Sequence, residues 1–125
     1  MLALSDTVVQ PKPPWLDRKL SYLTHLVDEP AEVKLISAAD KLHNCSSIVR
    51  DYKHLGEEIF ERFNAKRTGT LWYYRSVVAA LSNNWSHWLV EDLRSKVIEL
   101  HEICGEPLPR TWESDVDWDA AGLRR

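Results

Sequence analysis

The side chains of this 125-residue chain that could carry chemistry centre on Asp40, in the run AADKLHN at residues 38–44. An aspartate among the apolar residues of a helix is costly to bury unless a cation or a metal ion pairs with it. Asn44 follows four residues later on the same helical face, so its amide could reach a metal-bound or phosphorylated group beside the carboxylate. Spacing alone favours the alternative, in which Asp40 forms a surface ion pair with Lys41 or another cation and Asn44 bonds to the backbone.

The elements that must position these residues are all predicted to be helical. Helices are expected over five segments, most of them with apolar residues at three- and four-residue steps: residues 14–27, 31–55, 57–63, 70–81 and 85–103. Pro30 separates the first two, and Gly56 and Gly105 supply C-terminal stops. Ser86 is a candidate N-cap for the last helix. The sequence therefore predicts an all-α protein whose longest helix carries Asp40.

Two other segments contain cations that could bear on a binding site. Residues 64–69 form a predicted polar loop whose Lys66 and Arg67 could close over an anion, although a solvated loop is the favoured alternative. In the helix over residues 14–27, Lys19 is expected to face away from the apolar stripe. Neither segment identifies a binding site by itself.

The C-terminal part of the chain differs in composition from the rest. Residues 106–125 form an acidic tail that contains proline and tryptophan. Such a tail is expected to be loosely ordered, although Trp112 and Trp118 could dock on the helices. The predicted organisation is one helical domain over residues 1–105 followed by this tail.

Charge and composition exclude several classes of function. The chain has 16 basic and 19 acidic residues, a net charge of −3 and no broad cationic patch, which argues against general nucleic-acid binding but not against a small anionic ligand. It has no run of 18 apolar residues and no basic leader, so a cytoplasmic protein that does not enter the membrane is expected. Cys45 and Cys104, far apart within helical segments, are expected to be reduced, partly buried thiols.

The run LISAADKLHN at residues 35–44 resembles the ADKLxN segment of the HD-superfamily metal-dependent phosphohydrolases, especially the RelA/SpoT-type hydrolases of the alarmone (p)ppGpp. Two flanking features agree with this resemblance. Residues 12–19 are similar to the Trp-x-x-x-Lys helix that precedes the segment in bacterial relatives, and residues 69–74 look like the aromatic helix that follows it. The resemblance covers residues 2–81 and is more specific than any one short motif. It implies an HD-domain-like helical bundle.

The resemblance also implies roles for four residues. In that family a divalent metal, often Mn²⁺, is held by an early His, a His-Asp doublet and a later Asp, and Asp40 matches the later Asp. Asn44 matches a residue that contacts the nucleotide, and Tyr73 matches an aromatic residue that packs against ribose or base. Lys41, within the same motif, is taken as a third substrate-binding residue. The family chemistry is attack on phosphorus by a metal-activated water.

The chain departs from the family pattern at the metal site. The His and the His-Asp doublet belong to helices before residue 12, where this sequence has no histidine, and none of its five histidines is followed by Asp. Residues 1–4 resemble the last turn of a helix, so Met1 is expected to fall partway through an HD-type domain that is truncated at its N-terminus. Mn²⁺ binding by this chain is then expected to be weak or absent. His54 and His101 are expected to be exposed or half-buried.

Three functions follow from these observations. The first, and the primary expectation, is a (p)ppGpp hydrolase-like phosphohydrolase that is inactive unless another chain supplies the missing ligands. The second is a non-catalytic module that binds a small phosphorylated nucleotide or a partner protein. The third is a helical interaction module that uses its aromatic residues, although each of these more often packs in a core: Trp72, Tyr73, Tyr74, Trp85 and Trp88. Loss of a covering helical pair would expose apolar faces, so a homo-oligomer is also expected.

Overall fold

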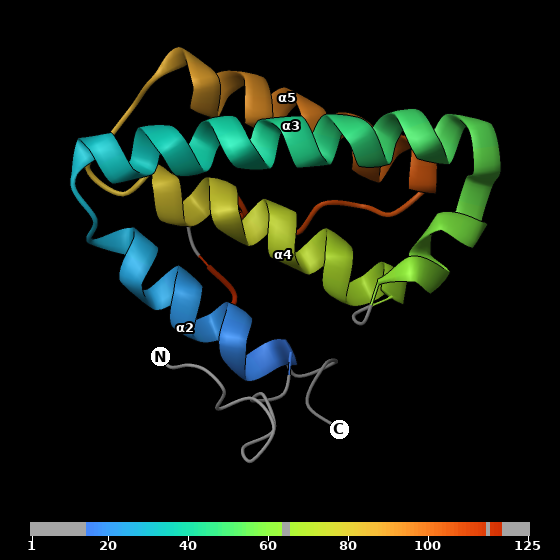
Figure 1. The fold of residues 1–125 in the computed structure, drawn as a ribbon, viewed down its shortest axis with the longest axis horizontal. Helices are drawn as coiled ribbons and strands as arrows, with labels where there is room; N and C mark the ends of the chain where they lie inside the picture. Colours follow the sequence, from blue (N-terminus) through green and yellow to red (C-terminus); the bar gives the residue numbers. More distant parts are fainter. Residues whose placement is uncertain (1–14, 64–65, 115, 119–125) are drawn as a thin grey trace, which may run out of the picture.

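In the computed structural model, residues 15–63, 66–114 and 116–118 are described, and they form an all-helical fold (Figure 1). Its elements in chain order are α2 (Trp15–Val27), α3 (Ala31–Leu55), the 3-10 helix η1 (Gly56–Arg62), α4 (Lys66–Leu81) and α5 (Trp88–Cys104). These ranges contain no strand, which confirms the predicted all-α class. Within them, no helix has both the length and the apolar character needed to cross a membrane. The helical turn predicted at residues 1–4 lies outside the described residues.

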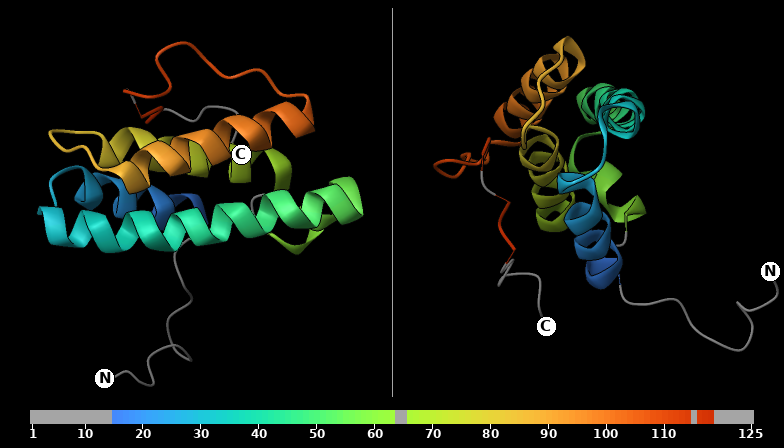
Figure 2. Two further views of the ribbon diagram at one scale, coloured as in Figure 1. Left: turned by 90° about the horizontal axis from the view of Figure 1, so that it is seen from above. Right: turned by 90° about the vertical axis from the view of Figure 1, so that its left-hand side faces the viewer.

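The arrangement places α4 at the centre of the molecule. α3 is the longest element, and α5 runs beside it (Figure 1). α4 packs against both, and α2 packs against α4 (Figure 1, Figure 2). Most of α4 is buried, including residues 69–73 and 76–81. A helix that is apolar on all sides is stable only when other elements surround it, which explains its central place.

The C-terminal ends of α3 and α5 are those predicted from the sequence, but the N-terminal cap of α5 is not. Gly56 and Gly105 end α3 and α5 with φ angles of 69° and 72°, as the sequence predicted, because glycine adopts positive φ without a steric penalty. The predicted cap Ser86 does not cap α5. Instead the helix begins later than predicted, and the His87 side chain accepts a hydrogen bond of 3.1 Å from the Leu89 N–H.

The C-terminal segment packs on the helices as far as residue 118. Trp112 is only 8% exposed and belongs to the hydrophobic core. The indole Nε1 of Trp72 donates a hydrogen bond of 3.0 Å to the carbonyl oxygen of Asp117. Trp118 is 43% exposed and contributes little. The described part of the tail therefore packs on the helices, mainly through Trp112.

The polar loop predicted at residues 64–69 is helical over much of its length. α4 begins at Lys66, and residues 64–65 are not described. Both cations of the predicted loop have carboxylate partners: Lys66 lies 3.0 Å from Glu61, and Arg67 contacts two glutamates. Their charges are already compensated, so closure over an anion is not supported here.

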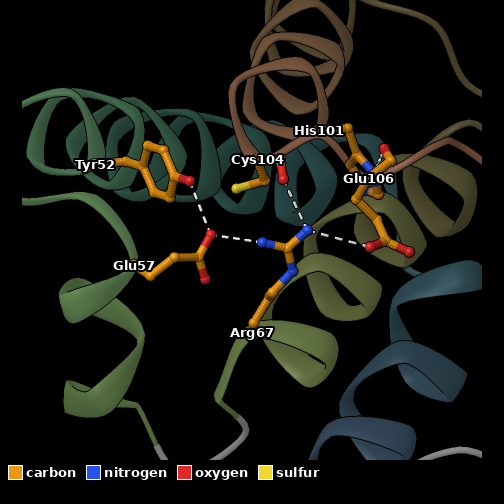
Figure 3. Close-up of polar contacts among 6 residues, drawn as sticks. All are labelled: Tyr52, Glu57, Arg67, His101, Cys104 and Glu106. Atoms are coloured by element: carbon orange, nitrogen blue, oxygen red, sulfur yellow. Dashed lines mark hydrogen bonds and ion pairs between the residues drawn. The ribbon is translucent and has the colours of Figure 1, made fainter.

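Arg67 ties three parts of the chain together (Figure 3). Its guanidinium donates to Glu57 of η1 at 2.5 Å, to the carbonyl oxygen of Cys104 at 2.8 Å and to Glu106 at 3.2 Å. The Tyr52 hydroxyl donates to the same Glu57 carboxylate at 2.8 Å, and this hydrogen bond raises the pKa of Tyr52 to about 12. These hydrogen bonds and ion pairs connect η1, the start of α4 and the end of α5.

His101 is buried, contrary to the prediction, whereas His54 is exposed as expected. The His101 ring is 2% exposed, and its Nδ1–H donates to the carbonyl oxygen of Glu106 at 3.0 Å (Figure 3). Its Nε2 is buried and has no hydrogen-bond partner among the described residues. Burial lowers the pKa of His101, and the positive charges of Arg75 and Arg67 lower it further. The sequence alone could not distinguish this histidine from a surface one.

The two cysteines are free and buried. Burial raises the pKa of Cys45 to about 12 and that of Cys104 to about 11. Both thiols are therefore protonated at neutral pH, which makes them poor nucleophiles and agrees with the expected structural role.

Candidate functional site

Asp40 lies on the solvent-exposed side of α3. Its side chain is 58% exposed, and the apolar neighbour Ile36 is 71% exposed, so the carboxylate is not buried among apolar residues. The carboxylate lies 3.1 Å from the Lys41 ammonium, and the Asn44 amide donates to it at 3.5 Å. This is the surface ion pair that spacing favoured, with Asn44 bonded to Asp40 instead of to the backbone. Burial therefore no longer argues for a metal at this position.

The residues around Asp40 do not form a metal-binding set by themselves. In the described part of the chain, no three His, Cys, Asp or Glu side chains are grouped closely enough to hold an ion. Asp40 and Asn44 offer three oxygen atoms from two side chains, whereas a hard divalent cation takes about six ligands. The described residues thus do not fit a catalytic metal, and the role of Asp40 as one ligand stays a prediction.

Lys41 and Tyr73, both predicted to bind substrate, do come together. The Lys41 side chain is only 15% exposed, and its Nζ lies 5.7 Å from the centre of the Tyr73 ring and 5.1 Å from that of Tyr22. A second ammonium, that of Lys19 on α2, lies 4.6 Å from the centre of the Tyr73 ring. Two cations at one aromatic ring form cation–π contacts and concentrate positive charge there.

The positive charge at this ring is only partly compensated. Burial lowers the pKa of Lys19, and the neighbouring charges of Lys41 and Arg18 lower it further. Such a shift shows that the folded chain disfavours the charged ammonium here. An anion placed beside Lys19 would reverse this effect, because it favours the protonated form.

A pocket of about 260 Å³ opens beside these side chains, between α2, η1 and α4. We call it the Tyr73 pocket. Its walls combine aromatic rings, one threonine and two cations: Trp15, Lys19, Arg62, Phe63, Thr70, Tyr73 and Tyr74. Arg62 also makes a long contact of 3.4 Å with Asp51 outside the pocket. The lining contains no carboxylate, so the pocket suits an anion that carries a flat apolar group.

Hydroxyl groups in the Tyr73 pocket are available to a ligand. Burial raises the pKa of both Tyr73 and Tyr74, so the phenols are neutral at physiological pH and do not repel an anion. Thr70 is 4% exposed. No described residue forms a hydrogen bond with any of these three hydroxyls, which can therefore donate to a bound oxyanion.

Sequence reasoning missed Lys19, Arg62 and the other pocket walls. Lys19 was expected to face away from the core, but it turns toward Tyr73 of the neighbouring helix. The signal that could have revealed it is the i, i+4 spacing of Trp15 and Lys19, which puts both on one face of α2. Arg62 lies far from both in sequence, and only the packing of η1 against α4 brings it near.

Comparison of the chain with protein-family models, with curated proteins and with solved structures gives no match. The observations that bear on function are therefore those of the site itself. The protein is a small all-helical one, with four α-helices in its described part and a cationic, aromatic pocket beside Tyr73.

Proposed function

We propose that this chain binds a small phosphorylated nucleotide in the Tyr73 pocket and has no hydrolytic activity of its own. The observation that carries the proposal is the pair of ammonium groups, Lys19 and Lys41, close to the ring of Tyr73, whose hydroxyl has no partner among the described residues. Nucleotides combine the two properties that such a site recognises, a flat ring and a multiply charged oxyanion.

The pocket divides naturally into two parts. The rings of Trp15, Tyr73 and Tyr74 offer surfaces for a base, and Lys19 and Arg62 offer cations for phosphate. A volume of about 260 Å³ lies just below the range of about 300–1,000 Å³ typical of small-molecule sites. The pocket therefore holds one end of a nucleotide, and the rest extends over the surface of α3 near Lys41.

The resemblance to HD-type phosphohydrolases supports the same ligand class. It assigns Asn44 and Tyr73 to nucleotide contact and Asp40 to one metal ligand. The negative charge of Asp40 contributes to the raised pKa of Tyr73, which places the carboxylate within electrostatic reach of the pocket. In this proposal, Asp40 is one ligand of a family metal site, and hydrolysis requires further ligands that the described residues do not supply.

Isothermal titration with ppGpp tests the binding proposal. Saturable binding is expected for ppGpp, with much weaker binding for uncharged guanosine, because the cations contribute only when phosphate is present. The affinity for ppGpp should fall as salt is raised. Equal affinity for ppGpp and guanosine, or no binding of ppGpp at low salt, would contradict the proposal.

A separate assay tests the lack of hydrolysis. Purified chain incubated with ppGpp and Mn²⁺ should release no pyrophosphate, because one carboxylate cannot hold and activate a metal-bound water. Robust Mn²⁺-dependent turnover by the chain alone would show that the ligands regarded as missing are not needed.

A further inference from the structure

A second cavity of about 260 Å³ lies between α4 and the C-terminal segment. It is lined by two residues of α4 and six of the segment: Arg75, Ser76, Pro109, Arg110, Thr111, Trp112, Val116 and Asp117. Trp72 lies between this cavity and the Tyr73 pocket. Its ring centre is 6.1 Å from that of Trp15, which lines the Tyr73 pocket, and its Nε1 donates to the Asp117 carbonyl oxygen.

Arg75 is the unexplained residue of this second cavity. Its side chain is half-buried, yet it makes no hydrogen bond or ion pair with any other described residue. Burial lowers the pKa of Arg75, and the negative charges of Asp117 and Glu106 only partly oppose this. A guanidinium has five N–H donors, and leaving them without acceptors after partial loss of water is costly. The neighbouring Arg67, in contrast, has three acceptors.

A second polar group in the cavity also lacks a partner. Ser76 is 2% exposed and lines the cavity, and its hydroxyl forms no hydrogen bond within the described part of the chain. Arg110 adds a second cation, and Asp117 is the one carboxylate in the lining, which leaves a net positive charge of one. Pro109, Trp112 and Val116 supply apolar surface. The single negative charge thus offsets only one of the two positive charges.

We propose that this cavity binds a small oxyanion, a carboxylate or a phosphate ester with a small apolar group, and that Arg75 is its principal ligand. The planar guanidinium matches two oxygens of either group, and Ser76 donates to one of them. The apolar part of the ligand contacts Trp112. Because residues 109–112 and 116–117 form one wall, a bound anion joins them to α4. The proposal is independent of nucleotide binding in the Tyr73 pocket.

NMR titration tests the proposal with two probes, sodium phosphate and sodium acetate, against sodium chloride at equal ionic strength. Saturable shifts are expected in the Ser76 amide and the Trp112 indole signals with at least one of the two probes and not with chloride. The probe that binds more tightly identifies the oxyanion. Equal shifts with chloride at the same ionic strength would show that the signals respond only to charge screening, and this would overturn the proposal.

Matched variants identify the ligand residue. Arg75→Gln should weaken binding at least tenfold, whereas Arg50→Gln, which removes an exposed arginine of α3, should leave it unchanged. Lys19→Gln should also leave it unchanged, which separates this site from the Tyr73 pocket. Shifts that survive Arg75→Gln would overturn the proposal. If that variant does not fold, Ser76→Ala serves as the test. Weaker binding of the phosphate or acetate probe by Ser76→Ala supports the site, and unchanged binding contradicts it.

Discussion

At the scale of single residues, Asp40 and Lys19 show what a sequence motif can and cannot reveal. The motif drew attention to Asp40, but the structure places this carboxylate in a surface ion pair, because the apolar residues around it on α3 are themselves exposed. Lys19 was predicted to face solvent, because a lysine beside other charged residues is usually solvated. It is instead one of the two cations at Tyr73. Residue type and spacing pointed to the region around Asp40. Only the packing of α2 against α4 showed that Lys19 lies at Tyr73.

Asp40→Asn tests the role of this carboxylate. We expect the affinity for ppGpp to rise by about two- to threefold at low salt, because a negative charge near the Tyr73 pocket is removed. The free energy of unfolding should change by less than about 1 kcal/mol, since an exposed ion pair contributes little. Asp92→Asn, at an exposed site on α5, is the control and should change neither quantity. A large loss of affinity would instead show that Asp40 contacts the ligand or its metal.

At the scale of elements, helical periodicity predicted which segments are helices more reliably than where they begin. The segments that became α2, α3, α4 and α5 were all recognised, because apolar residues at helical spacing reflect burial on one or more faces. The starts of α4 and α5 were misplaced. Arg67 looked like a loop cation, but its acceptors are the Cys104 carbonyl oxygen and two glutamates that are distant in sequence. Contacts of this kind leave no periodic signal.

The junction between α5 and the C-terminal segment should respond to pH. The pKa of His101 is lowered below its ordinary value of 6.5 by burial, so the unfolded chain takes up a proton at a higher pH than the folded chain. Its stabilising contribution is therefore complete above about pH 6.5 and is lost as the pH falls below that value toward the folded pKa. Urea unfolding should give a lower free energy of unfolding at pH 5.5 than at pH 7.5, by up to about 1.4 kcal/mol per pH unit from this group.

Two histidine variants separate this effect from general acid destabilisation. His101→Asn removes the titrating group, so the decrease between pH 7.5 and pH 5.5 should become smaller, whatever the variant's absolute stability. His54→Asn, at an exposed position of α3, should retain the decrease seen in the unchanged chain. An equal decrease in all three proteins would show that His101 does not control the pH response.

At the scale of the whole molecule, the core is continuous from α2 to Trp112, but one side of α3 has no apolar cover among the described residues. Val33, Leu35 and Ile36, near the start of this helix, are 38%, 38% and 71% exposed. Apolar groups exposed together are unusual on a monomer and are typical of interfaces. The expectation of a homo-oligomer, made from the sequence, therefore has a specific surface to which it can be assigned.

Sedimentation equilibrium tests self-association through this surface. We expect a concentration-dependent dimer, and Ile36→Glu should shift it toward monomer by placing a charge in the buried contact. Leu55→Glu is the matched control, because Leu55 is also exposed, at 51%, but lies at the other end of α3. A monomer at all concentrations, or equal effects of the two variants, would rule out this face as the contact.

The measurement that tests the proposed function most directly is the affinity for ppGpp of Lys19→Gln compared with Lys53→Gln. Both changes remove one lysine charge, but Lys19 lies over the Tyr73 ring, whereas Lys53 lies 2.8 Å from Glu99, which is outside the pocket lining. Lys19→Gln should weaken binding about tenfold, the loss expected for one charge-assisted contact, and Lys53→Gln should have little effect. Equal affinities of the two variants would show that the Tyr73 pocket is not the nucleotide site.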